Sequence, residues 1–235
     1  MDPGQAPGVY TGGANVIAVL ILLVEFGMFR QALLRDQIRL YATQSGLISV
    51  LAVIVGAARH LPELYVLAVL AAVLKVVAIP LVLRRLVSGA EPADDPAGDP
   101  AADGDISGSG GLGLASTVLV AIIVAAFGFF AAAALPVSGS GAPVTALSVS
   151  VSVVLVAFVL MIHRQDVASQ AIGLFSLENG ISLAALVVAA SLPLILELAL
   201  LFDLLLAVVV VGLLIRMHHG RAESLSTADL TGLRG

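Results

Sequence analysis

The chain has 235 residues, of which 60% are hydrophobic and 11% are charged, and its mean hydropathy is +1.10. This composition is typical of a protein embedded in a lipid bilayer and excludes a water-soluble globular domain. The chain contains no cysteine, which excludes disulfides, thiolate metal sites and cysteine-ligated iron–sulfur clusters. We therefore expect no cofactor in this chain. Its net charge of −5 comes from an acidic excess concentrated in one linker, and we expect no nucleic-acid partner.

Seven apolar runs, each long enough to cross a bilayer as a helix, predict an all-α polytopic membrane protein. They lie at residues 14–34, 40–58, 64–83, 112–135, 144–163, 168–190 and 194–216. We divide the chain into an N-terminal three-helix unit (1–87), an acidic linker (88–111), a bridging helix with its outer loop (112–142) and a C-terminal three-helix unit (143–235). The linker is rich in Ala, Gly, Pro and Asp, so we expect a disordered cytoplasmic segment.

The basic residues predict the orientation of the helices in the membrane. With the N-terminus outside, nine of the eleven basic residues face the cytoplasm, Arg59 faces outward, and Lys75 lies within a span. The nine are Arg30, Arg35, Arg39, Arg84, Arg85, Arg164, Arg216, Arg221 and Arg234. Since cytoplasmic loops carry an excess of Lys and Arg, we expect a multi-pass protein of the cell (inner) membrane with its C-terminus in the cytoplasm.

Four ionisable side chains lie near the middle of apolar runs: Glu25, Lys75, Glu178 and Asp203. A charge at the centre of a bilayer costs at least about 2.5 to 3.5 kcal/mol, so such a residue normally faces a partner or an internal water path. Burial favours the neutral form of an ionisable group and pairing favours the charged form, so a set of this kind can be tuned to exchange protons. We predict that Glu178 and Asp203 carry protons or ions, that Lys75 modulates them or passes the charge onward, and that Glu25 is a possible partner.

Structural alternatives exist for all four residues. The two acids of the C-terminal half could be hydrogen-bonded across helices to Asn179 or Ser182. Lys75 could pair with Glu25 merely to hold two helices together.

Proline and glycine mark two further features of the apolar runs. Pro80 leaves the carbonyl of Val76 without its helical donor, so we expect a kink beside Lys75. Gly173 and Gly180 predict close packing of their helix against a neighbour.

A shift of 134 positions brings out an internal repeat that extends through three helices and two loops. It aligns Arg30-Gln31 with Arg164-Gln165, Gln44-Ser45-Gly46 with Glu178-Asn179-Gly180, and Glu63 with Glu197. Four spans separate the first helix from the fifth, so both halves have the same orientation and form a parallel repeat. The architecture then consists of three helices, a linker, a bridging helix and three helices.

Several motifs of the C-terminal half resemble the smallest core membrane subunit of respiratory complex I, the three-helix K-type subunit, and the C subunits of Mrp-type antiporters. They are His163-Arg164-Gln165-Asp166, Ala171-Ile172-Gly173-Leu174, Glu178-Asn179, Asp203, His218-His219, and the tail from Glu223-Ser224-Leu225 to Leu233-Arg234-Gly235. One position departs from the pattern. The complex I subunit carries its first membrane glutamate directly after the Ile-Gly-Leu stretch, where this chain has Phe175, and Glu178 follows nearly one helical turn later.

The whole chain more closely resembles component E of hydrogenase-4 and formate hydrogenlyase complexes. The additional motifs of the N-terminal half are Glu63-Leu64-Tyr65, Leu74-Lys75 and Ile79-Pro80. The resemblance implies a non-catalytic membrane subunit of a complex I-like hydrogenase or dehydrogenase. It would couple electron transfer in peripheral, metal-bearing subunits to proton or sodium movement, next to antiporter-like membrane subunits.

Two other functions fit the same composition. An independent secondary transporter could be built on the parallel repeat, with a substrate site between its halves. A substrate site of this kind should show helices broken by Gly or Pro at matching positions of both halves. The position of the second half that corresponds to Pro80 is Leu214, which does not break a helix. A purely structural spacer is disfavoured by the four charges near the membrane centre.

Overall fold

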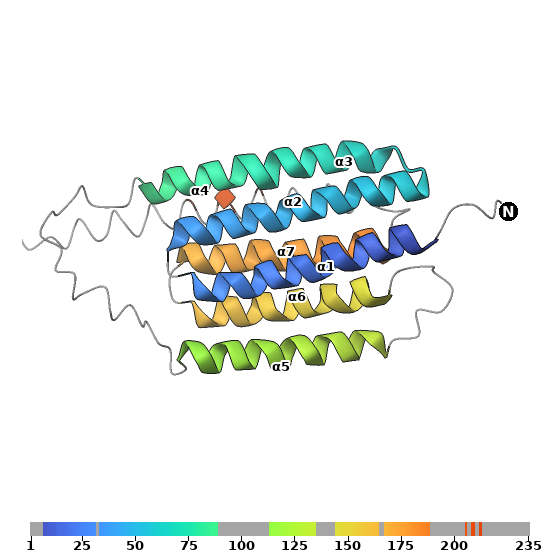
Figure 1. Ribbon diagram of the computed structural model, residues 1–235. Helices are drawn as coiled ribbons and strands as arrows, with labels where there is room; N and C mark the ends of the chain where they lie inside the picture. Colours follow the sequence, from blue (N-terminus) through green and yellow to red (C-terminus); the bar gives the residue numbers. More distant parts are fainter. Residues whose placement is uncertain are drawn as a thin grey trace, which may run out of the picture.

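The computed structural model describes residues 7–31, 33–88, 113–134, 144–164 and 167–188, together with positions 205, 208, 209 and 212. Within this part of the chain the secondary structure is helical, without a strand (Figure 1). The elements are α1 (Pro7–Arg30), α2 (Leu34–Arg59), α3 (Glu63–Ala71), η1 (Ala72–Ala78), α4 (Ile79–Ser88), α5 (Leu114–Ala133), α6 (Val144–His163) and α7 (Val167–Val188). The prediction of an all-helical protein is confirmed for these residues.

Six helical stretches of the described chain are long and apolar enough to cross a membrane, which makes this a membrane-embedded protein. They correspond to the first six predicted runs, although α1 begins and ends several residues earlier than expected. The seventh run, 194–216, lies outside the described residues apart from four positions that are helical. The acidic linker also falls outside them, except for Ser88 at its start.

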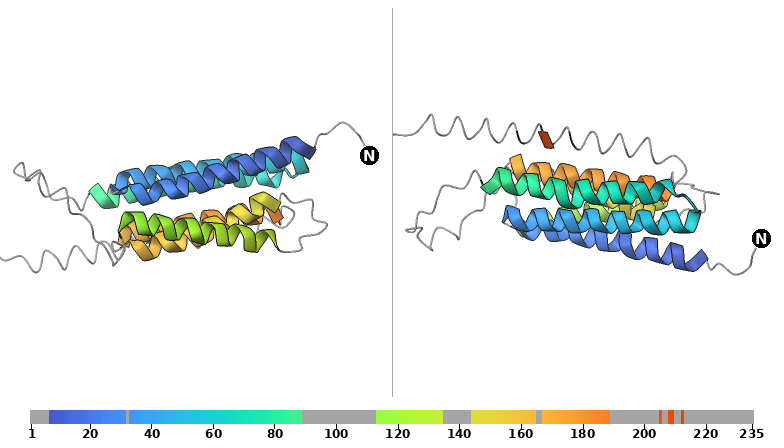
Figure 2. Two further views of the ribbon diagram at one scale, coloured as in Figure 1. Left: turned by 60° about the horizontal axis from the view of Figure 1, so that its bottom comes forward. Right: turned by 90° about the horizontal axis from the view of Figure 1, so that it is seen from above.

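The helices form two layers (Figure 2). One layer holds α1, α2 and the continuous α3–η1–α4 helix, and the other holds α5, α6 and α7. Between the layers, α1 packs against α6 and α2 packs against α7. Helix α5 packs mainly against α6, at the side of the bundle away from α3 and α4 (Figure 1).

Two apolar clusters fill the space between the helices. One contains Ile21, Leu51, Leu64, Val149 and Leu183, and lies in the half of the bundle that includes the turn between α2 and α3. The other contains Met28, Ile38, Leu83, Leu160 and Phe175, and lies in the half near the loop between α1 and α2. The segments of α1, α2, η1 and α7 between these clusters carry the charged and amide side chains described below.

In the third span, where the sequence predicts a kink beside Lys75, the structure has a π-helical segment. Segment η1 is π-helical, and the backbone N–H of Ile79 donates to the carbonyl of Leu74, five residues earlier. Pro80 has no N–H to donate, and its ring would clash with the carbonyl four residues before it in a regular α-helix. A wider turn relieves this clash, so the helix continues into α4. Lys75 lies in the middle of the π-helical segment.

Glycines let α7 approach α6 closely. A Cβ atom at Gly180 would lie 2.8 Å from a methyl carbon of Val154 and 3.1 Å from the backbone nitrogen of Val154. A Cβ atom at Gly173 would lie 2.6 Å from Cγ of Met161. These contacts explain why α7 carries glycine at both positions, as the sequence predicted.

Candidate functional site

Eight polar side chains lie together between the two apolar clusters, and we call them the polar network. They share almost complete burial, with no more than 8% of any residue exposed. They are Glu25 from α1, Gln44 and Ser45 from α2, Lys75 from η1, and Ser176, Glu178, Asn179 and Ser182 from α7. Each interrupts an apolar helix, so they meet where the helices pack against one another.

Lys75 forms the charged end of this network. Its Nζ atom lies 2.8 Å from Oε1 of Glu178, and both side chains are buried. The same ammonium donates hydrogen bonds to Oδ1 of Asn179 at 3.4 Å and to Oγ of Ser182 at 3.3 Å. Lys75 is therefore paired with Glu178 and not with Glu25.

Asn179 continues the network from α7 to α2. Its Nδ2 atom donates to Oε1 of Gln44 at 3.0 Å and to Oγ of Ser45 at 2.9 Å. An ammonium can only donate, so the atom of Asn179 that faces Lys75 must be the oxygen, and the amide nitrogen must face Gln44. The direction of these hydrogen bonds is thus determined by Lys75.

Glu25 forms the other end of the network. Nε2 of Gln44 donates to Oε2 of Glu25 at 2.7 Å, and Ser176 donates to the same carboxylate oxygen. Oγ of Ser176 also lies 3.0 Å from Oε1 of Gln44. One hydroxyl hydrogen can serve only one of these two acceptors at a time. If Glu25 is protonated, its carboxyl O–H can donate to Oγ of Ser176. The Ser176 hydroxyl can then donate to Oε1 of Gln44, so that both contacts are hydrogen bonds.

The charges of the network do not balance. Among the residues that the structure describes, its two carboxylates, Glu25 and Glu178, face a single ammonium, Lys75, so this set would carry one excess negative charge when fully ionised. An uncompensated charge in an apolar interior is costly, and the group normally takes up a proton or a counter-ion. Since Lys75 is paired with Glu178, the excess charge falls on Glu25. The arrangement can therefore hold one exchangeable proton.

The central members of the network lie at one depth. Ten residues separate each of three members from the end of its span at one face of the bundle. The pairs are Gln44 and Leu34, Lys75 and Arg85, and Glu178 and Ala168. At 1.5 Å per residue this is about 15 Å, half the thickness of the hydrocarbon core. Three of the four residues predicted to form the site, Glu25, Lys75 and Glu178, thus belong to one network. Asp203 lies outside the described residues.

Sequence reasoning did not select Gln44, Ser45 and Ser176 as site residues. The signal available for them is their spacing. Ser176, Asn179 and Ser182 recur every three residues and so share one face of α7, and Gln44 and Ser45 are adjacent polar residues within an apolar run. Neutral polar side chains in a span were overlooked because only the ionisable ones carry a large desolvation cost.

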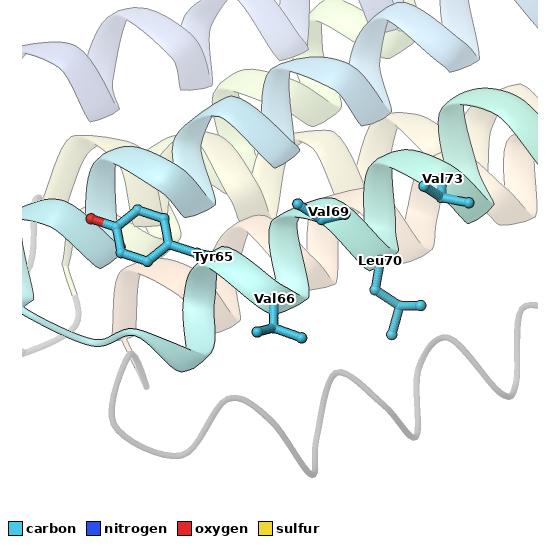
Figure 3. A pocket seen from close by; sticks show the side chains of 5 residues that line it. All are labelled: Tyr65, Val66, Val69, Leu70 and Val73. Atoms are coloured by element: carbon cyan, nitrogen blue, oxygen red, sulfur yellow. The ribbon is translucent and has the colours of Figure 1, made fainter.

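An apolar hollow of about 500 Å³ lies on α3 and η1. It is lined by Tyr65, Val66, Val69, Leu70 and Val73 (Figure 3). The lining residues that the structure describes offer no convergent polar groups of the kind that fix a polar ligand. Among the described residues there is also no group of three or more His, Cys, Asp or Glu side chains that could hold a metal ion.

Comparisons with known proteins identify one relative without an assigned activity. No protein-family model matches the chain, and no solved structure matches it. The chain is 42% identical over 82 residues to a protein of Mycobacterium tuberculosis (strain ATCC 25618 / H37Rv) described as "Uncharacterized protein Rv0085". The aligned part is 34% of this chain and 36% of the relative, so the chain spans about a third of the length of this relative.

Proposed function

We propose that this protein is a membrane subunit of a complex I-like assembly, a group 4 hydrogenase or a related dehydrogenase. In this assembly it moves protons in response to electron transfer in partner subunits. The single observation that carries the proposal is the polar network, which joins two buried carboxylates through Gln44, Asn179 and Lys75 near the centre of the membrane. The motif resemblance to hydrogenase-4 component E supports the kind of complex.

The chemistry assigned to the network is uptake and release of one proton. Glu25 holds this proton next to Ser176, and its release leaves a negative charge at one end of the hydrogen-bonded network. That charge attracts the Lys75 ammonium through the aligned amides of Asn179 and Gln44, which weakens the pairing of Lys75 with Glu178. Glu178 then becomes the next proton acceptor. Proton loss at one end is thereby coupled to proton uptake at the other.

The parallel repeat and the seventh span belong to the same proposal. Two pairs of positions related by the shift of 134 residues contact one another: Ser45 accepts a hydrogen bond from Asn179, and the ring of Tyr41 lies against that of Phe175. A two-fold axis along the bundle would produce such contacts between equivalent positions. Asp203, in the predicted seventh span, is proposed as a further carrier beyond Glu178.

The proposed orientation places the N-terminus outside and the C-terminus in the cytoplasm. The loop between α1 and α2 and the end of α4 then face the cytoplasm with Arg30, Arg35, Arg84 and Arg85. The proposed partners are antiporter-like membrane subunits and peripheral subunits with metal centres, and this chain contributes no catalytic centre of its own.

Purification of the tagged protein in mild detergent tests the proposed assembly. We expect it to come out with large antiporter-like membrane subunits and with metal-bearing redox subunits, identified by mass spectrometry and by metal analysis. Sealed vesicles containing the assembly should take up protons when electron donor is supplied. A chain that is purified alone and transports a small solute would contradict the proposal and favour an independent transporter.

A further inference from the structure

A line of polar residues extends along α2 from its first turn to the polar network. Gln37, Tyr41 and Ser45 are four residues apart, so they lie on one face of the helix at intervals of about 6 Å. Gln37 and Tyr41 are completely buried, and Ser45 is 1% exposed. This face of α2 therefore carries one polar side chain per turn through the apolar cluster nearest the loop between α1 and α2.

Gln37 lies where this line meets the end of the bundle. Its Nε2 atom donates to the carbonyl of Gln31 at 2.9 Å, and Nη2 of Arg164 donates to the same carbonyl at 2.7 Å. Arg164 also donates to the carbonyl of Met28 at 3.0 Å. Oε1 of Gln37 is buried and makes no hydrogen bond with any residue that the structure describes.

Tyr41 lies between Gln37 and the network. Its ring packs against Phe175 with 5.7 Å between ring centroids and 46° between ring planes. Its hydroxyl lies close to the side chain of Ser45 and within electrostatic range of Glu178. No described residue is placed to complete a direct hydrogen bond with this hydroxyl. A phenylalanine would make the same packing contacts without the cost of burying a hydroxyl, so the packing alone does not explain tyrosine here.

Buried polar atoms in proteins are nearly always hydrogen-bonded, to protein or to ordered water. One helical turn, about 6 Å of rise, separates Gln37 from Tyr41, and ordered water between them would complete the hydrogen bonds of both oxygens. We propose that Gln37 and Tyr41 line a narrow water path that carries protons from the end of the bundle at the loop between α1 and α2 to Glu178 and Lys75. This inference rests on the proposed function. It identifies the transported ion as the proton, because a desolvated metal cation needs several oxygen ligands at once, and oxygens that are one helical turn apart cannot all contact one ion.

The test uses the absence of cysteine from the natural sequence. Single cysteines are introduced as Gln37→Cys and Ser45→Cys on the path, and as Ile38→Cys and Ser148→Cys off it. Ile38 and Ser148 are completely buried, like Gln37, and Ser148 donates only to the carbonyl of Val144 on its own helix. Sealed vesicles with the intact complex are treated with Ag⁺ on the side of the loop between α1 and α2, then denatured, and the remaining thiols are labelled with a fluorescent maleimide.

Gln37→Cys and Ser45→Cys should be blocked at least about tenfold faster than their controls, because only a thiol in contact with water ionises and reacts. Ser45→Cys is nearly isosteric, so it keeps the test valid if the larger change at Gln37 impairs assembly. Blocking of both path cysteines at the rate of Ile38→Cys and Ser148→Cys would overturn the water path.

The same vesicles distinguish this inference from the proposed function. If the path cysteines are protected while Glu25→Gln still abolishes proton uptake, the water path is wrong and the proton-carrying network is retained. If the path cysteines are blocked quickly while Glu25→Gln takes up protons normally, the water path is supported and the role of the network is wrong.

Discussion

Asn179 donates to Gln44 across the contact between α7 and α2, with 3.0 Å between Nδ2 and Oε1. On its other side, Asn179 accepts a hydrogen bond from Lys75 at 3.4 Å. Gln44 in turn donates to Glu25 at 2.7 Å. Every amide of this network thus has its oxygen toward the ammonium and its nitrogen toward the carboxylate. The dipoles of the two amides add, which couples Lys75 electrostatically to Glu25.

Asn179→Leu should therefore interrupt the network near its middle. The substitution keeps the size of the side chain but leaves Oε1 of Gln44 and the Lys75 ammonium each with one hydrogen bond fewer in an apolar interior. We expect the lost amide hydrogen bond to cost about 0.5 to 1.5 kcal/mol and the lost hydrogen bond to the ammonium about 1.5 to 3 kcal/mol, measured as a lower melting temperature in detergent. Ser150→Ala is the control, because Ser150 donates only to the carbonyl of Leu147 on its own helix. Equal melting temperatures for the two variants would contradict the role given to Asn179.

The pair of Lys75 and Glu178 predicts strong energetic coupling. Lys75→Met leaves the Glu178 carboxylate buried without its cation, which should cost about 3 to 5 kcal/mol of stability. In the double variant Lys75→Met, Glu178→Gln no buried charge is left from the pair, so most of the stability should return. The measurement is a double-mutant cycle on melting temperature and complex yield. Additive losses from the two single changes would show that the ion pair does not hold these helices together.

Gly180 and Gly46 occupy equivalent positions of the repeat but differ in their surroundings. A Cβ atom at Gly46 would lie 3.9 Å from the nearest atom, a methyl of Val76, whereas one at Gly180 would lie 3.1 Å from the backbone of Val154. Gly180→Ala should cost about 1 to 3 kcal/mol, because α6 and α7 must move apart. Gly46→Ala should be neutral or stabilising by up to about 1 kcal/mol, because alanine favours a helix. Melting temperatures of the two variants in detergent test this difference, and the reverse order would contradict the close contact between α6 and α7.

The sequence predicted the helices well and the partners of the charged residues poorly. Apolar runs of about 20 residues show that a span is present, because lipid leaves the backbone no other hydrogen-bonded form, but they do not give the exact residues at which the helix begins and ends. The pairing of Lys75 with Glu178 could not be predicted, since it depends on which faces of η1 and α7 meet. The π-helix before Pro80 also lay beyond the sequence signal, since proline predicts a disturbed turn but not how the turn rearranges.

The neutral residues of the site are harder to predict from the sequence than the charged ones. Gln44 and Ser176 are recognisable only once Glu25 is seen to contact both of them. Burying a neutral polar side chain in a membrane costs little free energy compared with burying a charge. A single such residue in a span is therefore no evidence of function by itself.

The excess of basic residues near the loop between α1 and α2 predicts the orientation of the bundle. A reporter that is active only in the cytoplasm should be active when inserted at Leu33, in this loop, and silent when inserted at Leu61, in the turn between α2 and α3. The opposite pattern would invert the proposed topology and would place the entrance of the water path on the outer face.

The most direct test of the central claim, that the polar network carries an exchangeable proton on Glu25, is proton uptake by sealed vesicles in which the whole complex is driven by its electron donor. Glu25→Gln keeps the size of the side chain, and Glu63→Gln is its control because Glu63 is exposed at the start of α3. The rate of proton uptake should fall about 10²-fold or more in Glu25→Gln, the contribution usual for a positioned proton-transfer group, with the complex intact on a native gel. Glu63→Gln should take up protons like the wild type. Wild-type uptake by an intact Glu25→Gln complex would contradict the claim and leave the network with a structural role.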